Sequence, residues 1–277
     1  QVTLPTVEGR RQILNIHSKE VLLDEDADLE RMAQITPGFS GADLANIVNE
    51  AALLAVRRDS DPVGMVDLEL ASERVVAGLQ RKMPLSDTVR RKVAYHEGGH
   101  ALVAQLLPDT DPIHKVSFIP TAKGALGYTM QMPEEGQYLL GQREREERRA
   151  VLLGGRSAEL LLVGEASTGA ANDLERATEL ARRMVTEFGM AEALGPVRYA
   201  PQAGAGYLGR MAGVRPELSP ETAAAVDRET RRLVEDAQSQ AMGLLRENEG
   251  MLHQVAETLL AQETISGDEI SRIVERV

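Results

Sequence analysis

Two histidines and a glutamate form the most informative group in this sequence, within the segment His96-Glu97-Gly98-Gly99-His100. On a helix, residues i and i+4 lie on one face, so both imidazoles can reach one tetrahedral zinc ion while the glutamate lies beside them. This arrangement is typical of metallopeptidases, in which the glutamate acts as general base. Random placement would give only about 0.01 matches to the pattern, so chance explains it poorly.

The competing interpretation is a pair of core histidines beside a surface glutamate. Positions 89, 93, 96, 100, 103 and 107 advance by steps of four and three, and all except the two histidines are apolar. The histidines therefore share the apolar stripe of an amphipathic helix. Because two imidazoles buried without a ligand are costly, the pattern favours a zinc site.

A catalytic zinc ion needs a third protein ligand, and the residues alone leave three candidates open. His114 stands at the start of an expected strand, and Glu159 lies on a helix whose apolar face the sequence does not fix. Asp173 is the one carboxylate on the stripe 173, 177, 180 and 184, which is otherwise apolar. An aspartate in the first helical turn can also serve only as a cap or for the helix dipole.

Amphipathic helices must position most of these residues. Ser40 and Asp43 have capping-box spacing, and Ser219 followed by Pro220 is a typical helix start. We expect helices over 7–17, 40–57, 65–79, 86–107, 142–163, 170–188 and 220–247, followed by two shorter ones that reach residue 277.

Strands are expected mainly over 113–119 and 126–132, as a hairpin or a pair of edge strands, with 197–199 as a further short candidate. The segment 126–132 could offer its backbone to an extended peptide substrate. The alternative is that this strand only closes a small sheet over the core.

At about 150 residues per domain, the length of 277 residues predicts roughly two domains. Residues 1–82 form a small four-helix unit in this interpretation, and residues 83–277 form a mostly helical domain with a small β-sheet. The expected linker is 80–86, which contains Pro84. The predicted fold class is therefore mainly α.

Composition argues against several classes of protein. Lys and Arg number 31 against 43 Asp and Glu, a net charge of −12, which disfavours binding to nucleic acid or to anionic membranes. The absence of cysteine excludes disulfides, thiolate zinc sites and cysteine nucleophiles. The sequence contains no run of 18 uncharged apolar residues, the length needed to span a bilayer. We therefore expect the chain as given to be soluble.

Five segments, in the same order along the chain, resemble the FtsH family of ATP-dependent zinc proteases. Three of them resemble the protease domain of that family: HEGGHAL (His96–Leu102), STGAANDLERAT (Ser167–Thr178) and ELARRMVTEFG (Glu179–Gly189). The other two resemble the helical lid that follows the AAA ATPase core of that family: GRRQIL (Gly9–Leu14) and TPGFSGADLANIVNEAALL (Thr36–Leu54). The similarity runs over nearly the whole chain.

The resemblance implies that Asp173 is the third zinc ligand, with Glu159 as the second choice, and that Glu97 is the general base. One departure is Gly98, where the family usually has alanine. Glycine inside a helix costs about 1 kcal/mol, but this departure removes no ligand.

The resemblance also implies an ATPase core upstream of Gln1. No GxxxxGK[ST] motif occurs in the sequence, so we expect ATP with Mg²⁺ to be hydrolysed only by the complete protein. In the lid, the resemblance implies His17, Gly41 and Ala42 as contacts to bound nucleotide. Apart from the resemblance, a histidine at a helix end is most often a surface residue and a glycine a turn or cap residue.

For the complete protein, the resemblance implies a homo-hexamer anchored in the cell inner membrane, with these domains on the cytoplasmic side and the anchor outside this chain. Unfolded proteins and membrane proteins are the implied substrates. A competing function is a catalytically silent module that assembles the hexamer and uses a structural metal site. Glu97 argues against that function, because a structural zinc site needs no carboxylate beside its ligands.

A literal GxGxxG motif spans residues 204–209, between Pro201 and Pro216. No βαβ unit surrounds it, as a dinucleotide-binding motif would require. A loop is the better interpretation of this segment.

Overall fold

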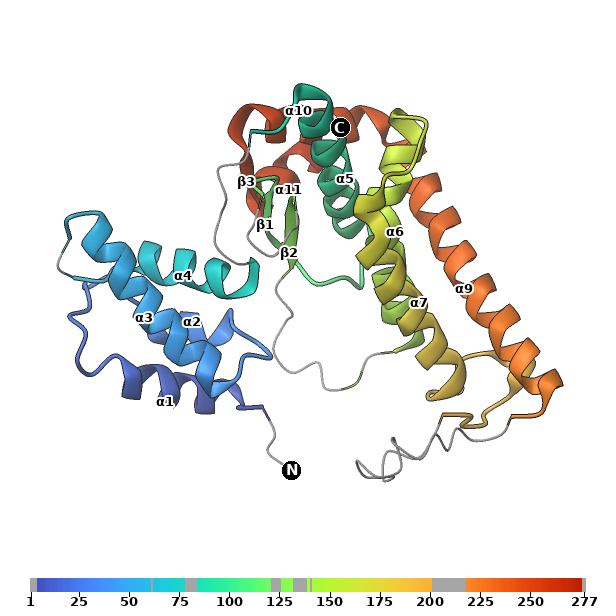
Figure 1. Ribbon diagram of the computed structural model, residues 1–277, viewed down its shortest axis with the longest axis horizontal. Helices are drawn as coiled ribbons and strands as arrows, with labels where there is room; N and C mark the ends of the chain where they lie inside the picture. The colour runs from blue at the N-terminus through green and yellow to red at the C-terminus, as the bar shows by residue number, and fades with distance from the viewer. Residues whose placement is uncertain are drawn as a thin grey trace.

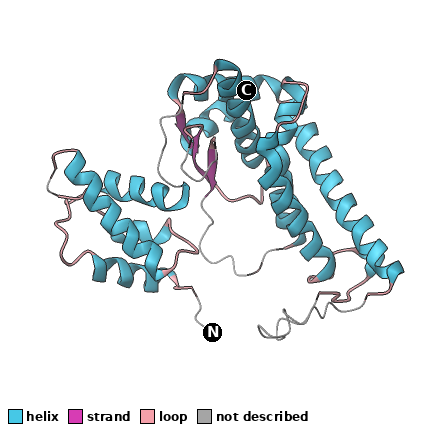
Figure 2. Cartoon of the chain, viewed as in Figure 1, coloured by secondary structure: helices cyan, strands magenta, loops and turns pink. Residues whose placement is uncertain are grey.

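A computed structural model describes residues 4–60, 62–77, 84–120, 126–131, 139, 141–200 and 218–275 of the chain. In these ranges ten α-helices and one small sheet form a smaller and a larger helical body, and the sheet lies on the side of the larger body that faces the smaller one (Figures 1 and 2). The predicted fold class, mainly α with a small sheet, is confirmed.

The smaller body contains the first four helices and has its own core. They are α1 (Val7–His17), α2 (Leu29–Gln34), α3 (Gly41–Arg57) and α4 (Met65–Ala77). The predicted capping box is present, since the Ser40 side chain accepts from the Asp43 amide and Asp43 accepts from the Ser40 amide. Leu14, Leu44 and Leu68 are fully buried between these helices. The described part of residues 1–82 thus contains four helices, while the division of the chain into domains stays a prediction and most of the expected linker lies outside the described residues.

The larger body packs its helices around a second core. Its α-helices are α5 (Asp87–Leu106), α6 (Gln142–Leu162), α7 (Ala171–Thr186), α9 (Pro220–Glu247), α10 (Glu249–Gln262) and α11 (Gly267–Glu275), and its 3-10 helices are η1 (Thr168–Ala170) and η2 (Glu192–Leu194). The Ser86 side chain caps α5, and Ser219 caps α9. Leu102 of α5 is fully buried in the same core as Leu245 and Leu252. None of the helices in the described ranges is both long and apolar enough to cross a bilayer.

Helices α5 and α6 cross at unusually close range. A Cβ atom on Gly99 would lie 2.5 Å from the carbonyl oxygen of Gly154 and 2.7 Å from Cβ of Ala158. A Cβ on Gly154 would lie 2.7 Å from the carbonyl oxygen of Gly99. Only glycine at both positions allows the two backbones to approach in this way. The crossing brings residues far apart in sequence to the two sides of one site.

The sheet is antiparallel and has the order β2-β1-β3, with β1 (Ile113–Ser117), β2 (Tyr128–Gln131) and β3 (Thr264–Ser266). Val116 in the central strand pairs with Thr129 on one side and with Ile265 on the other. The two expected strands are present, but sequence reasoning missed β3, which makes β1 the central strand and leaves β2 and β3 as the two edge strands of the described sheet. Gly267 follows β3 directly, where a Cβ atom would lie 1.8 Å from the carbonyl oxygen of Ile113.

The expected strand at 197–199 is wrong. These residues form an irregular segment with no neighbouring strand in the described residues, and Val197 is 47% exposed. The amides of Tyr199 and Ala200 both donate to the carbonyl oxygen of Thr186, the last residue of α7. The segment therefore satisfies a free carbonyl at a helix end, a local hydrogen bond that β propensity does not reveal.

Candidate metal centre

Helix α5 places both histidines of the predicted motif on one buried face. His96 is 9% exposed and His100 8% exposed, and their Nε2 atoms lie 3.1 Å apart. Gly155 of α6 lies against both rings, and α5 packs its apolar residues against α6 and α10, so the two polar rings lie inside the protein. The rings stand nearly perpendicular, with centroids 4.7 Å apart.

Helix α7 brings Asp173 to the same point. Its Oδ2 atom lies 3.4 Å from His96 Nε2 and 3.4 Å from His100 Nε2. In the described residues, these three side chains are the group whose donor atoms could hold a metal ion. Donors 2.0–2.1 Å from a tetrahedral zinc ion are separated by about 3.3 Å, so the observed triangle fits zinc in size and donor type.

The other ring nitrogens have partners that fix the orientation of both imidazoles. His96 Nδ1 lies 2.8 Å from Glu159 Oε1, and His100 Nδ1 lies 2.7 Å from the carbonyl oxygen of Val151. Both partners are acceptors, so each Nδ1 donates a proton to its partner, which leaves each Nε2 as the ring atom that can bind a metal ion.

Glu159, the second choice for a ligand, lies behind His96. The Ser167 hydroxyl donates to Glu159 Oε1 over 2.8 Å, and the Ser167 amide donates to Oε2. These hydrogen bonds, which also involve His96, outweigh burial and lower the pKa of Glu159. The carboxylate thus suits a partner that orients the imidazole.

Electrostatics keeps Asp173 ionised. Burial alone would raise the pKa of Asp173, but hydrogen bonds to His100 and His96 outweigh burial and hold it far below its usual range. Burial lowers the pKa of His96, while its bonds to Asp173 and Glu159 raise that pKa to about 10. The centre therefore combines carboxylate charge with the His96 imidazole, which binds a positive species, either a proton or a metal ion.

Glu97 lies beside the histidines and is 6% exposed. Burial raises the pKa of this carboxyl, although the nearby histidines oppose the shift. The Thr129 hydroxyl on β2 donates to Glu97 Oε2 over 3.0 Å. A Cβ atom on Gly127 would lie 2.6 Å from Glu97 Oε1, so only glycine leaves room for the carboxylate. The side chain is held in one place by the strand that covers it.

Gly155 on α6 lies directly against the two imidazoles. A Cβ atom there would lie 2.5 Å from His100 Nε2 and 2.7 Å from His96 Nε2. Sequence reasoning missed Gly155, and it placed Thr129 and Gly127 in the expected strand 126–132 without foreseeing their contacts with Glu97, because these contacts depend on how α5, α6 and β2 pack. The only signal in the sequence is the pair of adjacent glycines on α6.

The remaining predicted residues lie elsewhere. His114 is on β1 and does not belong to the donor cluster, and burial lowers its pKa. His17 is exposed at the end of α1, and Gly41 and Ala42 begin α3. Their nucleotide contacts stay a prediction. The GxGxxG motif at 204–209 lies outside the described residues.

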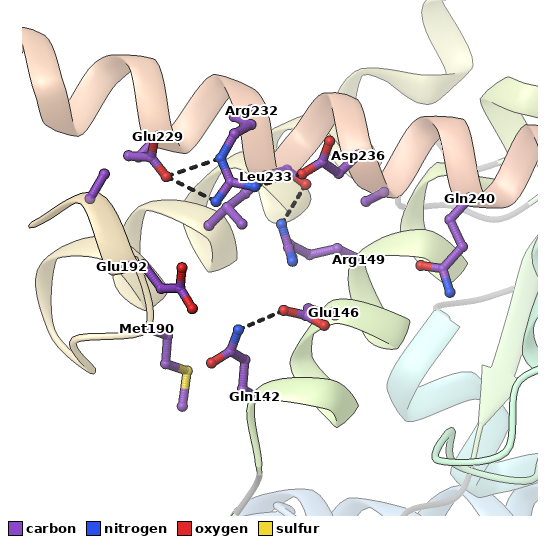
Figure 3. Close-up of a pocket in the computed structure, with 12 residues that line it drawn as sticks. Gln142, Glu146, Arg149, Met190, Glu192, Glu229, Arg232, Leu233, Asp236 and Gln240 are labelled. Carbon is purple, nitrogen blue, oxygen red and sulfur yellow. Dashed lines mark hydrogen bonds and ion pairs between the residues drawn. The ribbon is translucent and has the colours of Figure 1, made fainter. Parts of the chain in front are cut away.

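A separate cavity of about 500 Å³ lies between α6, α9 and η2 (Figure 3). Arg149, which is 2% exposed, reaches into it and donates to the carbonyl oxygen of Leu233. The side chains of Glu146, Glu229 and Arg232 also line the cavity. No member of the histidine–aspartate cluster does, so this cavity is distinct from the candidate metal centre.

Comparison with known proteins accounts for both parts of the chain. Residues 83–273 match Peptidase family M41, and residues 26–70 match the AAA+ lid domain. The chain is 46% identical over 275 residues to the ATP-dependent zinc metalloprotease FtsH of Syntrophobacter fumaroxidans, and 44% identical over 271 residues to that of Thermotoga maritima. These alignments cover 99% and 98% of this chain but 42% and 44% of the relatives. The chain thus spans less than half the length of these curated relatives.

The matched region 83–273 contains both histidines, Glu97 and Asp173. The match to the lid domain and the identity of nearly half to two relatives agree with the resemblance seen in the sequence. This chain belongs to peptidase family M41.

Proposed function

We propose that this chain is the lid and the zinc metalloendopeptidase part of an ATP-dependent protease of the FtsH type. The observation that carries the proposal is the triangle of donor atoms on His96, His100 and Asp173, with sides of 3.1, 3.4 and 3.4 Å. A buried glutamate beside that triangle supplies the base that peptide hydrolysis needs. The names of the relatives, which are zinc metalloproteases, support the same reaction.

In the mechanism, His96, His100 and Asp173 would hold the ion, and Glu159 keeps His96 in the tautomer that binds it. When bound, zinc supplies Lewis acidity that lowers the pKa of water to about 7 and polarises the scissile carbonyl. Glu97 takes the proton of the attacking water and then delivers it to the leaving amine. Burial, which raises the pKa of this carboxyl, makes it a stronger base for the first transfer.

The edge strand β2 is the proposed docking place for the substrate backbone. Within the described residues β2 pairs only with β1, and its residue Thr129 contacts Glu97. An extended peptide added to this edge would lie next to the general base. Main-chain hydrogen bonds do not depend on side chains, which suits a protease that accepts many sequences.

The complete protein is proposed to be a membrane-anchored homo-hexamer that binds ATP with Mg²⁺ and degrades unfolded and membrane proteins. The relatives' names include ATP dependence, and their remaining length leaves room for an ATPase core and an anchor. We place the boundary between lid and protease domain at residues 82 and 83, in agreement with the match that begins at residue 83.

Metal analysis together with casein digestion tests the proposed reaction. We expect about one zinc ion per chain, and we expect Glu97→Gln to retain zinc while casein cleavage falls by at least about 100-fold, because an amide cannot accept the proton. Zinc-loaded wild-type protein that leaves casein intact would instead favour the silent assembly module.

Two variants separate the third ligand from its alternative. Asp173→Ala removes a ligand and should leave the protein without zinc and without activity. Glu159→Gln removes only an orienting partner, so zinc affinity should fall by about 10–100-fold and zinc should still bind at saturation. Full zinc content in Asp173→Ala together with its loss in Glu159→Gln would make Glu159 the ligand.

A further inference from the structure

A buried carboxylate of the lid contacts the sheet of the protease domain. Glu73 lies on α4 and is 7% exposed. Its Oε1 atom lies 2.7 Å from Lys115 Nζ on β1, and its Oε2 atom accepts from the hydroxyl of Tyr128 on β2 over 3.3 Å. Burial, followed by the charge of Glu73, raises the pKa of Tyr128, so this hydroxyl keeps its proton and donates.

The residue that follows Tyr128 contacts the general base. Thr129 donates from its hydroxyl to Glu97 Oε2 over 3.0 Å, and the same hydroxyl lies 3.4 Å from the carbonyl oxygen of Glu97. Successive side chains of a strand point to opposite faces, so β2 presents Tyr128 to the lid and Thr129 to α5. Two adjacent residues therefore join a lid carboxylate to the carboxylate of the active site.

The strand has little freedom on the side of the base. A Cβ atom on Gly127 would lie 2.6 Å from Glu97 Oε1, 2.8 Å from its Cγ and 2.9 Å from the carbonyl oxygen of Ser117. Any shift of β2 toward α5 would displace Glu97, and any shift away would lengthen the bond from Thr129. The position of β2 thus sets the position of the base.

Glu73 differs in its partners from Glu69, the neighbouring carboxylate on the lid helix. Glu69 lies one turn earlier on α4 and pairs with Arg31 of the lid over 2.9 Å. Glu73 instead reaches out of the lid, and its side chain is 8% exposed against 27% for Glu69. Because Glu73 is buried, removal of Lys115 would leave its charge without this partner, and removal of Glu73 would release the strand from the lid.

We propose that Glu73 is a positioning residue for peptide hydrolysis: by binding Lys115 and Tyr128, it docks the lid on β2 and holds Glu97 in place. This inference rests on the proposed function, in which Glu97 is the general base. The lid then contributes to the chemical step itself, so displacement of the lid slows hydrolysis even of a short peptide that needs no unfolding.

The test measures cleavage of a short, internally quenched peptide by the full chain loaded with zinc. Glu73→Ala should lower kcat by about 10–100-fold with little change in KM, because a small displacement of a catalytic group costs that much in rate. Zinc content should remain at the wild-type value, since no ligand is touched. The matched control, Glu69→Ala on the same helix, should keep kcat within about twofold of wild type.

Charge exchange distinguishes docking from a general loss of fold. Glu73→Lys and Lys115→Glu should each lower kcat, and the double variant should recover at least part of the loss, a coupling that simple misfolding would not produce. Wild-type kcat in Glu73→Ala, or an equal loss in Glu69→Ala, would overturn the inference. So would the absence of any recovery in the double variant.

The Glu97→Gln variant distinguishes failure of the positioning role of Glu73 from failure of the proposed function. If Glu97→Gln is inactive while Glu73→Ala is fully active, only the positioning role is lost. If Glu97→Gln retains wild-type kcat, the base is misassigned and both proposals fall.

Discussion

At the scale of single residues, Gly155 controls the space in which a metal ion would bind. A Cβ atom there would lie within 2.7 Å of both Nε2 atoms that face the centre. The Gly155→Ala variant should therefore lose most of its zinc, because the added methyl group occupies the side from which the imidazoles bind the ion. Zinc analysis and the absorption spectrum after Co²⁺ substitution measure this outcome.

Gly98 provides the matched control for Gly155. A Cβ atom on Gly98 would meet Val255 Cγ1 at 3.4 Å and Leu252 Cδ1 at 3.6 Å, which are ordinary contacts. Gly98→Ala should keep its zinc and gain up to about 1 kcal/mol in the free energy of unfolding, from the better helix propensity of alanine. Full zinc content in Gly155→Ala would contradict the inference that Gly155 leaves the room in which the ion binds.

Sequence could identify the ionisable residues of the site but not the glycine and threonine that contact them. Both histidines and Glu97 were predictable because one helical turn fixes their spacing without any knowledge of the fold. Asp173 was predictable only as one of several candidates, since its place depends on how α7 packs. The roles of Gly155 and Thr129 arise from contacts between separate elements, and their residue types carry no chemical signal of their own.

At the scale of elements, the crossing of α5 over α6 holds the site together. Gly99→Ala would force a methyl group to within 2.5 Å of the Gly154 carbonyl oxygen, so the helices must separate. We expect the free energy of unfolding to fall by about 1–3 kcal/mol, as for other overpacked cores. Denaturation by urea, followed by circular dichroism, measures the change.

A glycine with open space around it serves as the control for that crossing. Gly243 on α9 would have no atom within 4 Å of an added Cβ. Gly243→Ala should therefore raise the free energy of unfolding by up to about 1 kcal/mol. Equal stability of the Gly99→Ala and Gly243→Ala variants would show that the close crossing is not needed.

Long elements were more predictable than short ones. The apolar periodicity and caps located α3, α5, α6 and α9 to within a residue or two at their ends. β3 has three residues, too few for a period, and its existence depends on pairing with a strand nearly 150 residues earlier. The 197–199 segment has β-prone residues but no partner strand, so propensity alone was misleading there.

At the scale of the whole molecule, zinc would join α5 to α7 and so stabilise the native state. Ligands from two helices come together only on folding, so metal binding adds its free energy to stability. Removal of zinc with a chelator should lower Tm by several degrees, because saturation at about 1,000 times Kd is worth about 4 kcal/mol. Differential scanning calorimetry measures the shift, and added zinc should reverse it.

The Asp173→Ala variant gives the reference for that measurement. Without the carboxylate from α7, its Tm should respond little to chelator or to zinc. A wild-type Tm that is the same with and without zinc would argue against an ion that bridges the two helices.

The order of strands in the sheet has a consequence for biosynthesis. β1 needs residues 264–266 as its second partner, and Gly267 packs against its first residue, so the three-stranded sheet that carries β2 is completed only after residues 264–267 have left the ribosome. Closing so long a loop is slow compared with forming the local helices. The three-stranded sheet therefore forms only after the helices α5, α6, α7 and α9 have been synthesised.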